Sequence, residues 1–289
     1  MTRQKIQLLI IDPQNDFCDL PQDWWPLDLV SGQRTAPALP VTGAHADLQR
    51  VAALVRAGGQ GIGQITVTLD SHHRIDIAHP GFWQQGDGSA VAPFTPITAQ
   101  QVRAGEFAPR DPAVLPRTLS YLNELEARGR YTLMVWPVHC EIGTWGHNLH
   151  ADLKAALGDW ETTQLTQLNL VLKGSNPWTE HYSAMQAEVP DGTDPATELN
   201  RTLLAELAQA DLLLIAGQAS SHCVKATTEH IVAHLPAEAA TRVMLLTDAM
   251  SPVGGFEANA QGFLADMRSR GVQLATCDQA LPLLTANFQ

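Results

Sequence analysis

The sequence predicts a three-layer α-β-α sandwich with a mostly parallel, Rossmann-like sheet of about six strands. Short apolar segments alternate with amphipathic stretches along the chain, and strands that are buried on both faces of a parallel sheet have this character. The 289 residues are 45% hydrophobic and 17% charged, which is enough apolar material for a large core and too apolar for a disordered chain. Since no second set of buried strands is visible, we expect residues 1–289 to form one domain.

The expected strands are short runs without charged side chains. In chain order they are 6–11, 65–69, 132–135, 168–172, 212–216, 243–246 and 272–275. Apolar residues at helical spacing predict the helices that lie between them. These helices are 45–56, 114–128, 148–156, 196–209, 221–235 and 256–270. Ligands of such folds bind at the carboxyl ends of the strands, so functional residues are expected directly after the strands.

Residues 71–116 do not follow this alternation. They are rich in proline and glycine, and we expect a long loop excursion here, followed by an extra helix at about 114–128. Loops of this length are usually functional or disordered. The glycines of 58–63 resemble a dinucleotide-binding loop, but their spacing does not fit G-x-G-x-x-G and they precede a strand. We therefore expect a helix end and a turn at that point.

Charge and hydropathy limit the classes of function. The net charge of −12 argues against binding to nucleic acid or to an anionic membrane surface, because both require a basic protein surface. No apolar run approaches the length of about 18 residues that a membrane-spanning helix needs, and the N-terminus lacks the features of a secretory signal. We expect a cytoplasmic protein with four free thiols, at Cys18, Cys140, Cys223 and Cys277.

Candidate metal ligands follow two of the predicted strands. Asp70 and His72 come after 65–69, and His139 comes after 132–135. Residues two apart in an extended chain point the same way, so the carboxylate and the imidazole could bind one cation. Such a ligand pair suits Zn, Fe(II) or Mn(II). The alternatives are two solvated side chains in a loop and an interior histidine.

Three further residues could carry chemistry. Asp12 directly follows the first strand, where an aspartate is more often a turn or cap residue. Lys173 ends an apolar strand, so it either reaches solvent or meets a carboxylate. Cys223 lies near the start of a predicted helix, where the helix dipole favours the thiolate and free amides can bind an oxyanion. Cys223 is the strongest single signal, and the other three cysteines are interpreted as structural.

Taken together, these residues resemble the isochorismatase-like cysteine hydrolase superfamily, and within it the nicotinamidase branch. The resemblance covers about Ile6 to Leu274, with extra residues between Trp83 and Tyr131. Five motifs occur in the family's order. They are Asp12-x-Gln14-x-Asp16-Phe17, Asp70-x-His72, Trp136-x-x-His139-Cys140, Lys173-Gly174 and Ser221-His222-Cys223-Val224.

The resemblance implies a catalytic triad of Asp12, Lys173 and Cys223. It also implies an oxyanion hole formed by the backbone amides of Ala219 and Cys223, with a cis peptide between Gln218 and Ala219. The implied cofactor is one divalent metal ion, with Zn as the first expectation and Fe or Mn as alternatives. Its implied ligands are Asp70, His72 and His139, with His79 as a possible fourth.

The resemblance also places Phe17 and Trp136 in the substrate pocket, as flat walls suited to a planar ring. Both could equally be core aromatics, which is the more frequent location of such residues.

The expected function is that of a hydrolase acting on the C–N bond of linear amides. It is a metal-dependent cysteine amidase that converts a small planar carboxamide, nicotinamide in the first place, to the acid and ammonia through a thioester. One alternative is a ureidoacrylate- or isochorismate-type hydrolase, and another is a catalytically silent protein that binds a small ligand. We expect the amide to be the small-molecule partner and the protein to be a homo-oligomer, as is common for such enzymes.

Overall fold

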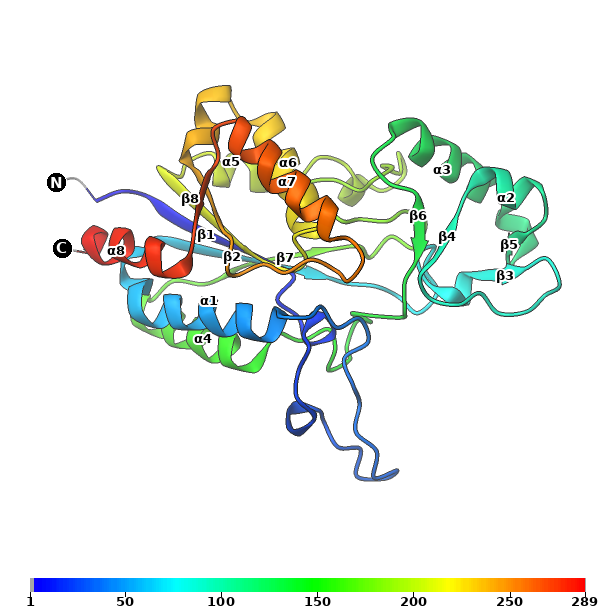
Figure 1. Ribbon diagram of the computed structural model, residues 1–289, viewed down its shortest axis with the longest axis horizontal. Helices are drawn as coiled ribbons and strands as arrows, with labels where there is room; N and C mark the ends of the chain where they lie inside the picture. The colour runs from blue at the N-terminus through cyan, green and yellow to red at the C-terminus, as the bar shows by residue number, and fades with distance from the viewer. Residues whose placement is uncertain (1–2, 289) are drawn as a thin grey trace.

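The protein, analysed as a computed structural model that describes residues 3–288, has the predicted three-layer architecture (Figure 1). Six strands form the central sheet in the order β10-β9-β8-β1-β2-β7, and all neighbouring strands pair in parallel. These strands are β1 (Ile6–Ile11), β2 (Gln64–Asp70), β7 (Asn169–Lys173), β8 (Leu212–Gly217), β9 (Val243–Leu246) and β10 (Gln273–Ala275).

Helices cover both faces of the sheet. One face carries α1 (Ala44–Gly58), α4 (Ala151–Gln164) and α8 (Cys277–Phe288), and the other carries α5 (Arg201–Leu207), α6 (Cys223–His234) and α7 (Glu257–Ser269) (Figure 1). The helix α8 was not predicted, and it contains Pro282, a residue that ordinarily interrupts a helix. No helix within residues 3–288 combines the length and the hydropathy needed to cross a bilayer.

The glycine-rich segment 58–63 is a helix end and a turn, as predicted. The helix α1 ends at Gly58, and a short 3-10 helix covers Gly59–Gly61. A Cβ atom on Gly61 would lie only 2.0 Å from the carbonyl oxygen of Leu284. Glycine is therefore needed here so that the backbones of the turn and of α8 can approach each other.

Residues 132–135 are not a strand of the central sheet, which corrects the prediction. The strand β6 (Leu133–Val135) instead pairs in antiparallel fashion with β4 (Thr95–Ile97). A short apolar run predicts burial in a sheet but does not reveal which sheet supplies the partner strand.

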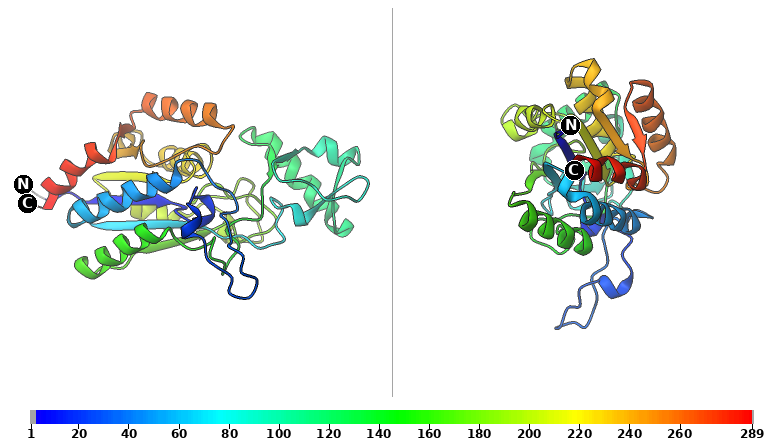
Figure 2. Two further views of the ribbon diagram at one scale, coloured as in Figure 1. Left: turned by 60° about the horizontal axis from the view of Figure 1, so that its bottom comes forward. Right: turned by 90° about the vertical axis from the view of Figure 1, so that its left-hand side faces the viewer.

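The segment expected as a loop, 71–116, contains regular structure. A second antiparallel pair joins β3 (Trp83–Gln85) to β5 (Phe107–Pro109), and the helix α2 (Ala99–Arg103) lies between β4 and β5. The helix α3 (Leu115–Arg128) follows. These elements extend from one end of the sandwich (Figures 1 and 2) and share a small hydrophobic cluster of their own. Three-residue strands are too short for periodicity to reveal, and the assignment of residues 1–289 to one domain stays a prediction.

Candidate active site

The residues predicted to carry chemistry gather at the carboxyl edge of the central sheet. Asp12 follows β1, Asp70 ends β2, Lys173 ends β7 and Cys223 begins α6 just beyond β8. The strands β8, β1, β2 and β7 are consecutive neighbours in the sheet. Four residues that lie far apart in the chain therefore converge because their strands are parallel and adjacent.

Lys173 lies at the centre of this group and is almost wholly buried, with its side chain 1% exposed. Its Nζ lies 2.9 Å from Oδ2 of Asp12 and 2.8 Å from Oδ1 of Asp70. The same ammonium donates to the carbonyl oxygen of His181 at 2.9 Å and lies 3.7 Å from Sγ of Cys223. Burial alone would lower the pKa of Lys173, but the two carboxylates raise it well above its usual value. Lys173 is therefore a permanent cation between the carboxylates and the thiol.

Asp12 is fully buried, and its side chain lies against Lys173 instead of capping a helix. Its Oδ1 accepts a hydrogen bond of 2.5 Å from the hydroxyl of Thr68. The backbone of Asp12 has a φ of 45°, which is uncommon for a residue other than glycine. Burial raises the pKa of Asp12 even though Lys173 opposes the shift. A carboxylate with a raised pKa is better matched to accepting and returning a proton near neutral pH.

The thiol of Cys223 is buried at the first residue of α6. Burial raises its pKa well above the usual value, and the nearby ammonium of Lys173 offsets only part of this shift. Burial therefore opposes the thiolate that the position at a helix N-terminus was expected to favour. A thiol with a raised pKa needs a base to remove its proton, and Asp12 is the carboxylate that lies nearby, on the same ammonium of Lys173.

Two backbone amides beside the thiol are unused. The amides of His222 and Val224 both donate to the carbonyl oxygen of Ala219, at 3.0 and 3.1 Å. Within residues 3–288, the amides of Ala219 and Cys223 donate no hydrogen bond. The peptide between Gln218 and Ala219 is cis. Two free amides beside a thiol can receive an oxyanion as it forms.

Three buried histidines form a cluster next to this group. His72, His79 and His139 each offer a ring nitrogen, and these nitrogens all lie within 4.8 Å of one another. Oδ2 of Asp70 lies 3.0 Å from Nε2 of His72 and 3.4 Å from Nε2 of His139. The structure thus brings together the three predicted ligands and also His79, which the resemblance offered as a possible one.

The hydrogen bonds of these imidazoles fit a metal ion. Each ring has a hydrogen-bond partner at its Nδ1. The partners are a carboxylate oxygen of Asp76 for His72 at 3.0 Å, the carbonyl of His73 for His79 at 3.1 Å and the carbonyl of Pro137 for His139 at 2.8 Å. The Nε2 atoms of His72 and His139 face Oδ2 of Asp70, and Nε2 of His79 lies 3.3 Å from Nδ1 of His139. Metal-binding histidines are ordinarily oriented in this way. Three nitrogens and one carboxylate oxygen form a ligand set that suits Zn, with Fe(II) or Mn(II) as alternatives.

A narrow cavity opens onto both groups. Phe17 and Trp136 both line it, so these aromatic side chains border the site as well as packing in the interior. Phe17 meets the ring of His139 edge-on with centroids 5.4 Å apart, and the Trp136 indole donates to the Tyr182 hydroxyl at 3.1 Å. The remaining lining residues are Leu39, Asp70, His139, Glu180, Tyr182, Ala219, His222, Cys223 and Val253.

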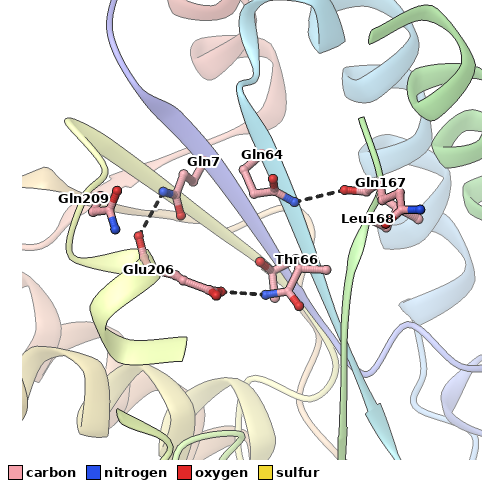
Figure 3. Close-up of a pocket in the computed structure, with 8 residues that line it drawn as sticks. Gln7, Gln64, Thr66, Gln167, Leu168, Glu206 and Gln209 are labelled. Carbon is pink, nitrogen blue, oxygen red and sulfur yellow. Dashed lines mark hydrogen bonds between the residues drawn. The ribbon is translucent and has the colours of Figure 1, made fainter. Parts of the chain in front are cut away.

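A wider surface depression lies at the opposite, amino edge of the sheet (Figure 3). Several of its polar side chains are already paired: Gln7 donates to the carbonyl of Glu206 at 3.1 Å and Gln64 to the carbonyl of Gln167 at 3.2 Å. The side chain of Asn169 donates to the carboxylate of Glu206 at 2.9 Å. The depression contains no cysteine, histidine or lysine. The chemistry of the described residues therefore lies at the carboxyl edge, in the narrow cavity.

Sequence reasoning missed several residues of the site. Thr68 could have been found, because it precedes Asp70 by two residues on β2 and so shares its face. Asp76, Glu180 and Tyr182 lie in irregular segments, where no periodicity marks the direction of a side chain. Oε1 of Glu180 accepts from the amide of His181 at 2.9 Å, whereas its buried Oε2 has no partner among the described residues.

The fold is shared with known enzymes. A yeast nicotinamidase is similar over 94% of this chain and 99% of its own, with a TM-score of 0.58 and 19% sequence identity. A nicotinamidase/pyrazinamidase from Acinetobacter baumanii gives the same TM-score and identity over 95% of this chain and 97% of its own. A pyrazinamidase from Pyrococcus horikoshii, solved in complex with zinc, is similar over 94% and 99% with a TM-score of 0.51 and 18% identity.

No protein-family model matches the chain, and no curated protein is a significant sequence match. The structural similarities confirm the isochorismatase-like fold, close to that of nicotinamidases, that the sequence motifs predicted.

Proposed function

We propose that this protein is a metal-dependent cysteine amidase that hydrolyses a small planar carboxamide, of which nicotinamide is the first candidate, to the acid and ammonia. One observation carries the proposal: Cys223 and Asp12 both lie against the buried ammonium of Lys173, beside two unused amides. A nucleophile, a base, a cation and an oxyanion site are the parts that acyl transfer through a thioester needs. The similarity to nicotinamidases and pyrazinamidases supports the choice of substrate class.

The first half of the reaction forms the thioester. Asp12 accepts the proton of the Cys223 thiol, and Sγ attacks the carbonyl carbon of the amide. Charge collects on the carbonyl oxygen, where the amides of Ala219 and Cys223 stabilise it. When the tetrahedral intermediate collapses, the C–N bond breaks, and Asp12 gives its proton to the leaving nitrogen, which departs as ammonia.

The second half returns the free enzyme. Water adds to the thioester carbon and gives a proton to Asp12, and the C–S bond then breaks to release the acid. Asp12 returns the proton to Cys223. Lys173 stays protonated throughout and stabilises the carboxylate and the sulfur anion as each forms.

The metal site and the aromatic walls would set the substrate's position. A divalent metal held by Asp70, His72, His79 and His139 would act as a Lewis acid toward a basic ring atom of the substrate. Phe17 and Trp136 would lie against the faces or edges of a planar ring. Fixing the ring in this way brings the carboxamide to Cys223. Holding the reacting groups in position lowers the activation free energy of the attack substantially.

The test is ammonia release from nicotinamide, pyrazinamide and a small aliphatic amide, with a ureidoacrylate included for comparison. The wild-type protein should release ammonia from the planar amides, and Asp12→Asn should lose most of this activity. Cys277→Ala serves as a matched control, because Cys277 is a buried thiol at the start of α8. Failure to release ammonia from any planar amide, or full turnover after complete metal removal, would contradict the proposal.

A further inference from the structure

One ring in the cavity has no part in the proposed reaction. His222 precedes the nucleophile, is 5% exposed and lines the cavity. Aromatic rings surround it. The centroid distances to its imidazole are 4.7 Å for Phe256, 5.2 Å for Trp136 and Tyr182 and 6.1 Å for Tyr131. Among the polar atoms of these rings, the Trp136 indole N–H is already paired with the Tyr182 hydroxyl at 3.1 Å, so the imidazole of His222 adds a hydrogen-bonding group to a mainly aromatic patch.

The hydrogen bonds of Ser221 fix which nitrogen of His222 carries the proton. The amide of Val253 donates to Oγ of Ser221 at 3.1 Å, so one lone pair of the hydroxyl is occupied. Oγ of Ser221 also lies 2.9 Å from Nδ1 of His222. The serine has no other acceptor among the described residues, so its hydroxyl donates to Nδ1. A neutral imidazole that accepts at Nδ1 carries its hydrogen on Nε2.

The imidazole is also uncharged. Burial lowers the pKa of His222 to about 4, and Lys225 adds to this shift. No hydrogen bond joins Nε2 to any residue within 3–288. This nitrogen nevertheless keeps some accessible surface, unlike the fully inaccessible side-chain atoms that lack a partner. His222 lines the cavity, and Nε2 is the ring nitrogen that lacks a protein partner, so it is the nitrogen free to meet a substrate.

We infer that His222 presents a fixed, neutral N–H donor at Nε2 to the substrate, and that among planar carboxamides it favours those that carry a hydrogen-bond acceptor on the ring besides the ring atom that faces the metal, whereas nicotinamide itself would bind without using this donor. The inference rests on the proposed function and adds a specificity-determining residue to it. A substrate without this acceptor leaves the donor unpaired in an aromatic surrounding, which costs affinity.

Matched pairs of amides test the selection. Nicotinamides with a methoxy or an ethyl group at the 5- or 6-position have similar size, but only the methoxy member has an acceptor. For one of the two positions, the wild-type kcat/KM should favour the methoxy compound by about three- to tenfold. His222→Phe should bring this ratio to about one, and His222→Gln, which retains an N–H donor, should keep part of it. His234→Gln, at the exposed end of the same helix, is the control and should keep the wild-type ratio.

A second measurement does not depend on turnover. Nitrogen-15 NMR of histidine-labelled wild-type protein should show His222 protonated at Nε2 and not at Nδ1, and Ser221→Ala should shift the tautomer balance toward Nδ1. Protonation at Nδ1 in the wild type, or a methoxy preference that is absent at both positions or unchanged in His222→Phe, would overturn the inference. If no amide is hydrolysed by the wild type, the proposed function fails, whereas the NMR result still decides the role of Nε2.

Discussion

Asp70 and Lys173 form a buried ion pair, with 2.8 Å between Oδ1 and Nζ, that joins the candidate metal site to the candidate catalytic group. The other oxygen of Asp70 lies 3.0 Å from Nε2 of His72. Burial alone would raise the pKa of Asp70, but His72 and Lys173 hold it well below its usual value. One carboxylate therefore belongs to both groups, and a change in it should alter metal binding and the reactivity of the thiol together.

Asp70→Asn should weaken zinc binding by at least about tenfold, because it removes the charged member of the ligand set. The same change should lower the pKa of Cys223, since the negative charge of Asp70 raises it. Zinc titration of metal-free protein measures the first effect. The rate of iodoacetamide alkylation at Cys223, followed by peptide mass spectrometry against pH, measures the second. A variant that loses zinc but keeps the wild-type alkylation profile would contradict the claim that Asp70 acts on both the metal site and the thiol of Cys223.

The histidine cluster predicts a selective loss of metal. His72→Ala, His79→Ala and His139→Ala should each lower the metal content of the purified protein, because each removes one of the converging ring nitrogens. His73→Ala is the matched control: its side chain is exposed, and only its backbone carbonyl contacts the cluster. Equal metal loss in all four variants, or full retention in His139→Ala, would show that the site is assigned wrongly.

The aromatic wall predicts a substrate-dependent effect. Trp136→Ala should raise KM for nicotinamide or pyrazinamide severalfold, because packing between aromatic rings contributes about 0.5–1.5 kcal/mol beyond the buried area. KM for a small aliphatic amide should change much less. Comparing the two substrates distinguishes a pocket residue from a core residue, because a purely structural defect would impair turnover of both alike. Thermal unfolding of the variant would show such a defect as a lower melting temperature.

His181 predicts a pH dependence of stability. Burial lowers the pKa of this histidine to about 3, and the charge of Lys173 contributes. The unfolded chain, whose histidines titrate near 6.5, therefore binds more protons than the folded one between about pH 3 and pH 6.5. The free energy of unfolding should fall as the pH drops through this window. His181→Gln should show a shallower fall than the wild type in urea titrations at pH 7 and pH 4, and His73→Gln, at the surface, should not. Parallel curves for His181→Gln and the wild type would refute the assignment.

Residues that directly follow strands could be predicted from the sequence, because the parallel sheet itself fixes where they meet. Asp12, Asp70, Lys173 and Cys223 are of this kind. His222 was visible beside the nucleophile, but the aromatic rings around it come from three separate segments, so its role could not be read locally. The location of 132–135 outside the central sheet was also beyond the sequence pattern, because its partner, β4, is only three residues long.

The acid–base roles were the least predictable part of the site. The position of Cys223 at a helix start suggested a thiolate, whereas full burial raises the pKa of the thiol by more than the charge of Lys173 lowers it. Burial depends on how the whole chain packs, and neither spacing nor composition reports it.

The central claim is that Cys223 forms a thioester with the acyl group of the substrate. Wild-type protein mixed with nicotinamide and quenched in acid within the first turnovers should gain the mass of the nicotinoyl group on the peptide that contains Cys223. Cys223→Ala should show no such adduct and should lose turnover by about 10³-fold or more while remaining folded. An active wild type without any adduct at Cys223, or a Cys223→Ala variant with near-normal kcat, would contradict the account.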